Sequence, residues 1–211
     1  TLATVRLPAT WIGLAAFFTY SGLEMAIGLW LFTLLTESRR LDPGLASVAV
    51  TTFWAGIVLS RVSVAAWSTH LPTRGILRCS MAGLVMSTAI LALDASRTID
   101  FAAVVFAGIA AGPVFPLLMA STAHRIGHEQ AANAVSLQVA VATIGQAILP
   151  SVLGAVAGRW GVHTLGLGLV MLACLAAGLA KVLFAYTPAE LQSLPPEIVV
   201  ERISLALPIA T

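Results

Sequence analysis

A long apolar run near the start of the chain limits what the chain can fold into. Residues 11–35 form a run of 25 residues whose one ionisable side chain, Glu24, lies near the middle. An α-helix rises about 1.5 Å per residue, so this run is long enough to cross the hydrocarbon core of a bilayer, which is about 30 Å thick. We therefore predict a transmembrane helix with a carboxyl group near the membrane centre.

The composition indicates an integral membrane protein. Hydrophobic residues make up 59% of the chain and charged residues only 9%, whereas about 25% of the residues of a soluble domain are charged. A formal net charge of +2 is too small to favour a nucleic-acid partner. Cys79 and Cys174 lie within apolar runs, so we expect small buried side chains rather than a disulfide or a metal site. We expect no metal and no cofactor.

Six apolar runs, separated by short polar or Gly/Pro-containing links, predict an all-α bundle of six transmembrane helices. Because the links are short, successive helices must be antiparallel neighbours. We expect residues 1–187 to form this bundle and residues 188–211 to form a tail whose apolar stretch is too short to span a membrane. The predicted spans are residues 11–35, 45–67, 76–93, 101–123, 131–157 and 162–185.

Basic residues give a weak preference for one orientation. The end of the bundle that holds the two termini carries six of them: Arg6, Arg74, Arg78, Arg125, Lys181 and Arg202. The opposite end carries four: Arg39, Arg40, Arg97 and Arg159. By the positive-inside rule, we predict that both termini and the tail are cytoplasmic, in a plasma or inner membrane.

Glu24 is the first candidate for a functional residue. A carboxyl group at the membrane centre is costly and usually faces a bundle interior or a wet cavity, where it serves in proton or substrate binding or bonds to a neighbouring helix. Tyr20 lies one turn earlier on the same helix face and is a second cavity candidate. Trp30 lies away from the Glu24 face, and it is either a stacking surface for a sugar ring or a side chain packed among lipids or helices.

The fifth span carries amides among alanines and valines. Gln138 and Gln146 lie broadly on one side of this helix, with Ala142 and Gly145 between them, which leaves room for a ligand. Amides in a membrane helix either line a polar pathway or hydrogen-bond between helices. Both uses stay open for these two residues.

The fourth span combines a GxxxG pattern with two prolines. Gly108 and Gly112 predict close helix packing, and Pro113 and Pro116 predict a kink.

Arginines flank the link between the second and third spans. Arg61, Arg74 and Arg78 are candidates for a charged latch that involves an acid elsewhere, or for side chains that extend to the lipid headgroups.

Three motifs together resemble one family. They are YSGLEMAIGLW in the first span, SRV followed by a short loop with TRG, and GIAAGPVFPLL in the fourth span. These motifs, over about residues 8–187, look like the carboxyl-terminal half of a major facilitator superfamily transporter. The pattern of Tyr20, Gly22, Glu24, Gly28 and Trp30 is most similar to the fucose and glucose/galactose permease-like sugar:proton symporters.

The resemblance implies a twelve-helix fold of two six-helix halves, alternating access around a central cavity, and no cofactor. It makes Glu24, Tyr20, Gln138 and Gln146 cavity candidates. The implied partners are a small-molecule substrate, protons, the lipid bilayer and an amino-terminal six-helix half, from the same longer chain or a second copy.

The resemblance also makes Arg61, Arg74 and Gly75 similar to the second-half copy of a gating loop. The acidic residue expected before the arginine is missing, and Leu71, Pro72 and Thr73 occupy its place.

The leading hypothesis is therefore secondary active transport of a small polar solute, in particular sugar:proton symport. The alternatives are a drug or metabolite exporter of the same superfamily, and a non-transporting membrane scaffold or enzyme. The chain contains no HExxH, P-loop or nucleophile-elbow motif, so we do not expect an enzyme.

Overall fold

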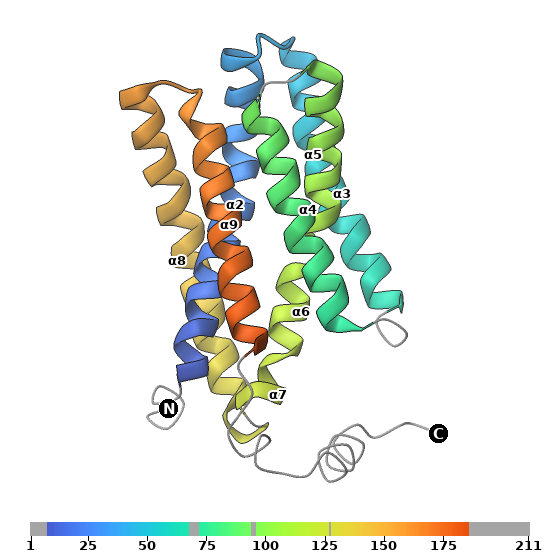
Figure 1. The fold of residues 1–211 in the computed structure, drawn as a ribbon, viewed down its shortest axis with the longest axis vertical. Coiled ribbons are helices and arrows are strands. Elements are labelled where there is room, and N and C mark those ends of the chain that lie inside the picture. The colour runs from blue at the N-terminus through green and yellow to red at the C-terminus, as the bar shows by residue number, and fades with distance from the viewer. Residues whose placement is uncertain (1–7, 68–71, 94–95, 127, 186–211) are drawn as a thin grey trace.

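Six long helical segments form a bundle in the computed structural model, which describes residues 8–67, 72–93, 96–126 and 128–185 (Figure 1). Each segment is long and apolar enough to cross a bilayer, and no strand occurs within the described ranges. The predicted all-α, six-span membrane fold is confirmed. The tail, residues 188–211, lies outside the described residues. The elements are α2 (Pro8–Thr33), the π-helix η1 (Leu34–Ser38), α3 (Pro43–Trp67), α4 (Thr73–Leu93), α5 (Arg97–Ala111), α6 (Val114–Ala120), α7 (Thr122–Ile126), α8 (His128–Trp160) and α9 (Thr164–Ala185).

Helix α2 lies in the interior of the bundle. It packs against α8 and α9 and, to a smaller extent, against α3. It runs parallel to α8, because Gly13 lies against Gln138 and, further along, Gly22 lies against Gly145. Helix α5 packs between α3 and α4, and α4 also packs against α9 (Figure 1). The helix that carries Glu24 is therefore surrounded by other helices over much of its surface.

The outer faces of the helices carry large apolar side chains. Leu59 and Val62 on α3, and Leu167 and Met171 on α9, are all exposed in the bundle. Contiguous apolar surface of this kind is unfavourable in water. Lipid chains would cover it, which agrees with the membrane assignment.

A short polar link turns the chain from α2 into α3. Pro43 occupies the first position of α3, where its missing N–H is not needed. Asp42 precedes it, and Asp42 Oδ1 accepts hydrogen bonds from the backbone N–H groups of Gly44 at 2.9 Å and Leu45 at 3.3 Å. These contacts satisfy two of the free donors at the start of the helix.

A buried ion pair fixes the same end of the bundle. Arg39, which follows η1, places Nε 3.4 Å from Asp100 Oδ2 in the first turn of α5, and Arg39 also donates to the carbonyl of Leu91. The side chains are only 8% and 2% exposed. Arg39 is one of the four basic residues counted at this end of the bundle, and its charge is neutralised inside the bundle by Asp100.

The fourth predicted span is not one continuous helix. Helix α5 ends at Ala111, α6 begins at Val114, and α7 follows at Thr122. Pro113 and Pro116 lack backbone N–H groups, so the carbonyls of Ile109 and Gly112, four residues earlier, have no helical donor. The helix is therefore interrupted at Gly112 and Pro113.

Close contact between α3 and α5 depends on glycines. A Cβ atom on Gly108 would lie 2.4 Å from the carbonyl oxygen of Phe53, and one on Gly112 would lie 1.9 Å from Ser60 Oγ and 2.6 Å from the Ile57 carbonyl oxygen. Real Cβ atoms do not approach other atoms so closely. The backbones of the two helices can therefore touch only because these side chains are absent.

Gly112→Ala should lower stability, whereas Gly158→Ala should not. Both glycines lie on helical backbone, but a Cβ on Gly158 in α8 meets no atom within 4 Å. We expect Gly112→Ala to cost about 1–3 kcal/mol through overpacking, and Gly158→Ala to be neutral or stabilising by up to about 1 kcal/mol. Thermal unfolding of the detergent-solubilised variants, followed by circular dichroism, measures both. Equal Tm values for the two variants would contradict the packing argument.

Candidate functional site

Glu24 on α2 is held by a side chain from α3. Arg61 Nη2 donates to both carboxylate oxygens of Glu24, at 3.0 Å to Oε1 and 3.1 Å to Oε2. Tyr20, one turn earlier on α2, has its hydroxyl oxygen 2.5 Å from Oε2. We call Tyr20, Glu24 and Arg61 the carboxylate cluster. Its carboxylate therefore has a cation and a phenol as direct partners.

The break between α5 and α6 supplies the cluster with a backbone acceptor. Pro116 leaves the carbonyl of Gly112 without its helical donor. Arg61 Nε donates to this carbonyl oxygen at 3.2 Å. One guanidinium thus joins the carboxylate on α2 to the break after α5.

Tyr20 also connects Glu24 on α2 with the break after α5. Its side chain is fully buried, and its hydroxyl oxygen lies 2.6 Å from the carbonyl oxygen of Ala111 as well as 2.5 Å from Glu24 Oε2. A phenol has one proton, so it donates to one acceptor at a time. A charged carboxylate is the stronger acceptor. The charge on Glu24 therefore determines whether Tyr20 donates mainly to the Glu24 carboxylate or to the Ala111 carbonyl.

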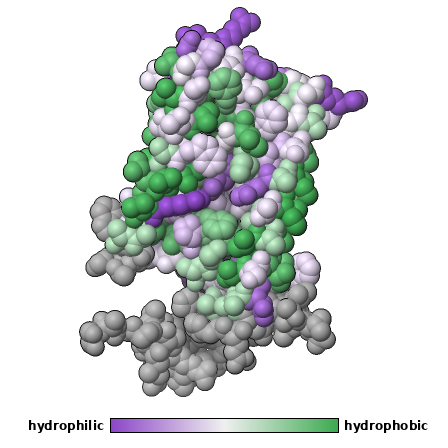
Figure 2. All heavy atoms as spheres, turned by 180° about the vertical axis from the view of Figure 1, so that it is seen from behind, coloured by the Kyte–Doolittle hydropathy of each residue, from purple (hydrophilic) through white to green (hydrophobic). Residues whose placement is uncertain are grey.

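The cluster lies at the boundary between the interior and an outer face. The Glu24 side chain is 11% exposed and that of Arg61 is 41% exposed. Figure 2 shows strongly hydrophilic side chains at mid-height among apolar and weakly polar ones, on the side turned away from the viewer in Figure 1. A lone charge at this depth would be costly. The ion pair offsets that cost while keeping one end of the pair accessible.

The two predicted amides of α8 lie in different surroundings. Gln138 is buried, and its Oε1 accepts a hydrogen bond from Thr122 Oγ1 of α7 at 3.0 Å. Gln146 is half-buried, and Pro150, four residues later, leaves its carbonyl without a helical donor. The structure thus places Gln138 in a helix–helix contact, whereas Gln146 is a polar position at the surface of α8.

Trp30 lies in the contact between α2 and α8 rather than beside Glu24. Its Nε1 donates to the carbonyl of Pro150 at 2.9 Å. Its ring lies against Gly154, where a Cβ would come within 2.3 Å of the indole. The absence of a side chain at residue 154 makes room for the indole, which fills the interface as a packing group.

The arginines predicted as a latch have different environments. Arg61 pairs with Glu24, whereas Arg74 and Gly75 lie in the first turn of α4. Arg74 is exposed and lines a groove between α4 and α9. The acid that pairs with Arg61 comes from α2, not from the loop that precedes Arg74.

Only part of the site could be predicted from the sequence. The sequence indicated Tyr20 and Glu24 on one helix face, but it did not identify Arg61 as the counter-ion or the Gly112 carbonyl as an acceptor. The proline four residues after Gly112 was the available signal for a free carbonyl. The Arg39–Asp100 pair had no signal, because the two residues are far apart along the chain.

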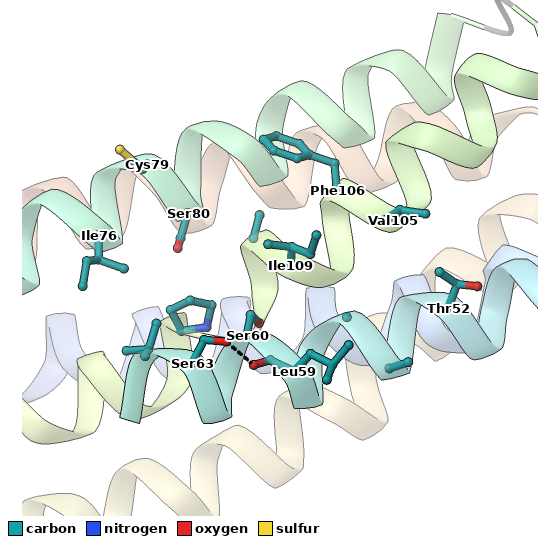
Figure 3. A pocket seen from close by; sticks show the side chains of 15 residues that line it. Thr52, Leu59, Ser60, Ser63, Ile76, Cys79, Ser80, Val105, Phe106 and Ile109 are labelled. Carbon is teal, nitrogen blue, oxygen red and sulfur yellow. Dashed lines mark hydrogen bonds between the residues drawn. The ribbon is translucent and has the colours of Figure 1, made fainter. Parts of the chain in front are cut away.

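A cavity of different chemistry is lined in part by Ser60 and Pro113, the sequence neighbours of Arg61 and Gly112. It has a volume of about 570 Å³ and lies between α3, α4 and α5 (Figure 3). Its lining is almost wholly apolar, and Ser63 Oγ donates to the Leu59 carbonyl at 2.9 Å instead of facing a ligand. Cys79 lines this cavity, and Cys79 and Cys174 are both exposed rather than buried as predicted. The cavity therefore offers a polar solute few hydrogen bonds.

Comparison with known proteins identifies the family. A search of characterised proteins finds no significant match. The family model of the Major Facilitator Superfamily matches residues 12–206, which is nearly the whole chain. Together with six apolar helices, this match shows that the chain is an integral membrane protein that belongs to the Major Facilitator Superfamily of secondary transporters.

Proposed function

We propose that the chain is the carboxyl-terminal half of a transporter that carries a small polar solute, a sugar, by proton symport. The similarity of Tyr20, Gly22, Glu24, Gly28 and Trp30 to the fucose and glucose/galactose permease-like symporters supports this. An amino-terminal six-helix half, in the same longer chain or in a second copy, would complete the central cavity. In this proposal both termini are cytoplasmic and the transporter works in a plasma or inner membrane.

The observation that carries the proposal is the bonding of Glu24. Its carboxylate accepts from Arg61, and Arg61 also donates to Gly112 at the break between α5 and α6. Protonation of Glu24 removes the charge that attracts Arg61. A proton on one side chain therefore alters the bonds that join three helices.

The consequences of protonation can be followed atom by atom. Neutral Glu24 is a weaker acceptor, so Tyr20 donates instead to the Ala111 carbonyl, 2.6 Å from its hydroxyl oxygen. Arg61 is then held only by the Gly112 carbonyl and becomes available to another acceptor. The break can move relative to α2, because the ionic connection between them is gone. This links proton binding to rearrangement of the bundle.

The solute would bind where Arg61 is exposed. A guanidinium has five N–H donors in a fixed arrangement, and two of its nitrogens already contact Glu24 and Gly112. Hydroxyl oxygens of a sugar can accept from the remaining donors once Glu24 is neutral. The solute thus takes the place of the carboxylate, and binding of proton and solute favour each other, as symport requires.

Glu24→Gln should strongly reduce proton-driven accumulation but preserve exchange. Glutamine keeps the size of the side chain and remains uncharged, so it imitates the protonated state permanently. Coupling between sites is typically about 5- to 150-fold, and we expect accumulation to fall about tenfold. Accumulation by the native protein and the variant is measured in proteoliposomes with an imposed proton gradient and labelled glucose, galactose or fucose.

Glu37→Gln is the matched control for this experiment. Glu37 is exposed in η1 and should leave both accumulation and exchange near their normal values. Glu24→Gln protein that accumulates solute at the normal rate and with the normal pH dependence would refute the role of Glu24.

Pro116→Ala should weaken the coupling by changing one hydrogen bond. Alanine restores an N–H that can bond the Gly112 carbonyl, so Arg61 Nε must compete for this acceptor. Hydrogen bonds to charged groups contribute about 1.5–3 kcal/mol, and we expect the accumulation ratio to fall at least about fivefold without loss of thermal stability. Pro150→Ala in α8 is the control, because Pro150 lies outside the cluster. Equal accumulation by the two variants would argue against the link between Arg61 and the break.

A further inference from the structure

A basic groove lies between the ends of α4 and α9, away from the carboxylate cluster. Its volume is about 590 Å³. Figure 1 shows these two helices side by side. The lining residues place the groove toward the end of the bundle where α9 finishes. The lining comes from one face of each helix: Arg74, Leu77, Arg78, Met81 and Ala82 on α4, and Ala177, Ala180, Lys181, Phe184 and Ala185 on α9.

The rim of the groove is strongly positive. Arg74, Arg78 and Lys181 are exposed, and none of the ten lining residues is acidic. In the part of the chain that the structure describes, no ion pair engages any of the three cations. Arg125 adds a further charge, because its guanidinium lies 5.0 Å from the ring centroid of Phe184. Burial lowers the pKa of Arg125 to about 10, so this group is also charged at neutral pH.

The floor of the groove is apolar and continues into the membrane. Leu77, Met81 and Ala180 are buried, and the alanines of α9 leave a hollow along the helix. The cations lie within the first two turns of one span and the last two turns of the other, Thr73–Leu93 and Thr164–Ala185. They are therefore at the depth of lipid headgroups, and the apolar floor is at the depth of acyl chains.

We propose that this groove binds an anionic phospholipid. The phosphate and any further headgroup charge contact Arg74, Arg78 and Lys181, while an acyl chain lies along Met81 and Ala177. Basic pockets between transmembrane helices are suited to such lipids. The combination of three unneutralised cations with an apolar floor favours a lipid over a free anion, because a free anion has no acyl chain to bury against the floor. The proposal is independent of the transport function.

The test compares lipids and matched double variants of the full chain. Arg78→Gln/Lys181→Gln removes two groove cations, and Arg97→Gln/Arg159→Gln removes two cations from the opposite end. Each cation near a membrane surface contributes about fivefold to binding, so the groove variant should bind phosphatidylglycerol about 25-fold more weakly. Native mass spectrometry of the protein in mixed detergent–lipid micelles counts the lipids retained, with phosphatidylcholine as the uncharged reference. Thermal unfolding gives an independent readout.

The proposal requires that phosphatidylglycerol is retained over phosphatidylcholine, that it raises Tm, and that only the groove variant loses both effects. Equal retention by the two double variants would overturn it. So would an equal rise of Tm with glycerol phosphate, because a free anion would then suffice. The tail is the remaining competitor, since Glu190, Glu197 and Glu201 follow α9 in the sequence. If neutralising these acids lowers the lipid-free Tm as much as the groove variant does, the tail occupies the groove and the proposal fails.

Discussion

An ionised carboxylate inside an apolar bundle requires a partner, and this requirement explains much of the arrangement around α2. Glu24 is 11% exposed and obtains its partner from α3, through Arg61. The guanidinium in turn needs acceptors for its other donors, and Gly112 provides one. Because Arg61 bonds to both Glu24 and Gly112, the charge on Glu24 affects the relative positions of α2, α3 and α5.

The prolines of the fourth span have a chemical role beyond bending the helix. In a regular helix each carbonyl accepts from the backbone N–H four residues later. Pro116 frees the carbonyl of Gly112, and the glycine also lets α3 approach closely enough for Arg61 to reach it. Packing and polarity thus depend on the same few residues, so a change in one affects the other.

The two ion pairs differ in a way that matters for motion. Arg39 and Asp100 are both almost fully buried, so separating them would expose charge to an apolar interior at a cost of several kcal/mol, about 3–5 when one partner is lost. Arg61 is far more exposed, and solvent or solute can replace its partner. The first pair therefore fixes one end of the bundle, whereas the second is suited to exchange. The basic groove between α4 and α9 lies apart from both pairs.

Hydropathy and span length by themselves determined six membrane helices and a polar position at Glu24, because insertion into a bilayer depends on local composition. The proline and glycine pattern likewise indicated a break in the fourth span. Only the tertiary structure decided that Arg61 reaches Glu24, that Arg39 is buried against Asp100, and that Trp30 fills the α2–α8 contact. These contacts join residues 37, 61 and 120 positions apart. The rotation and depth of packed helices, which a single helical pattern does not contain, decide which side chains meet.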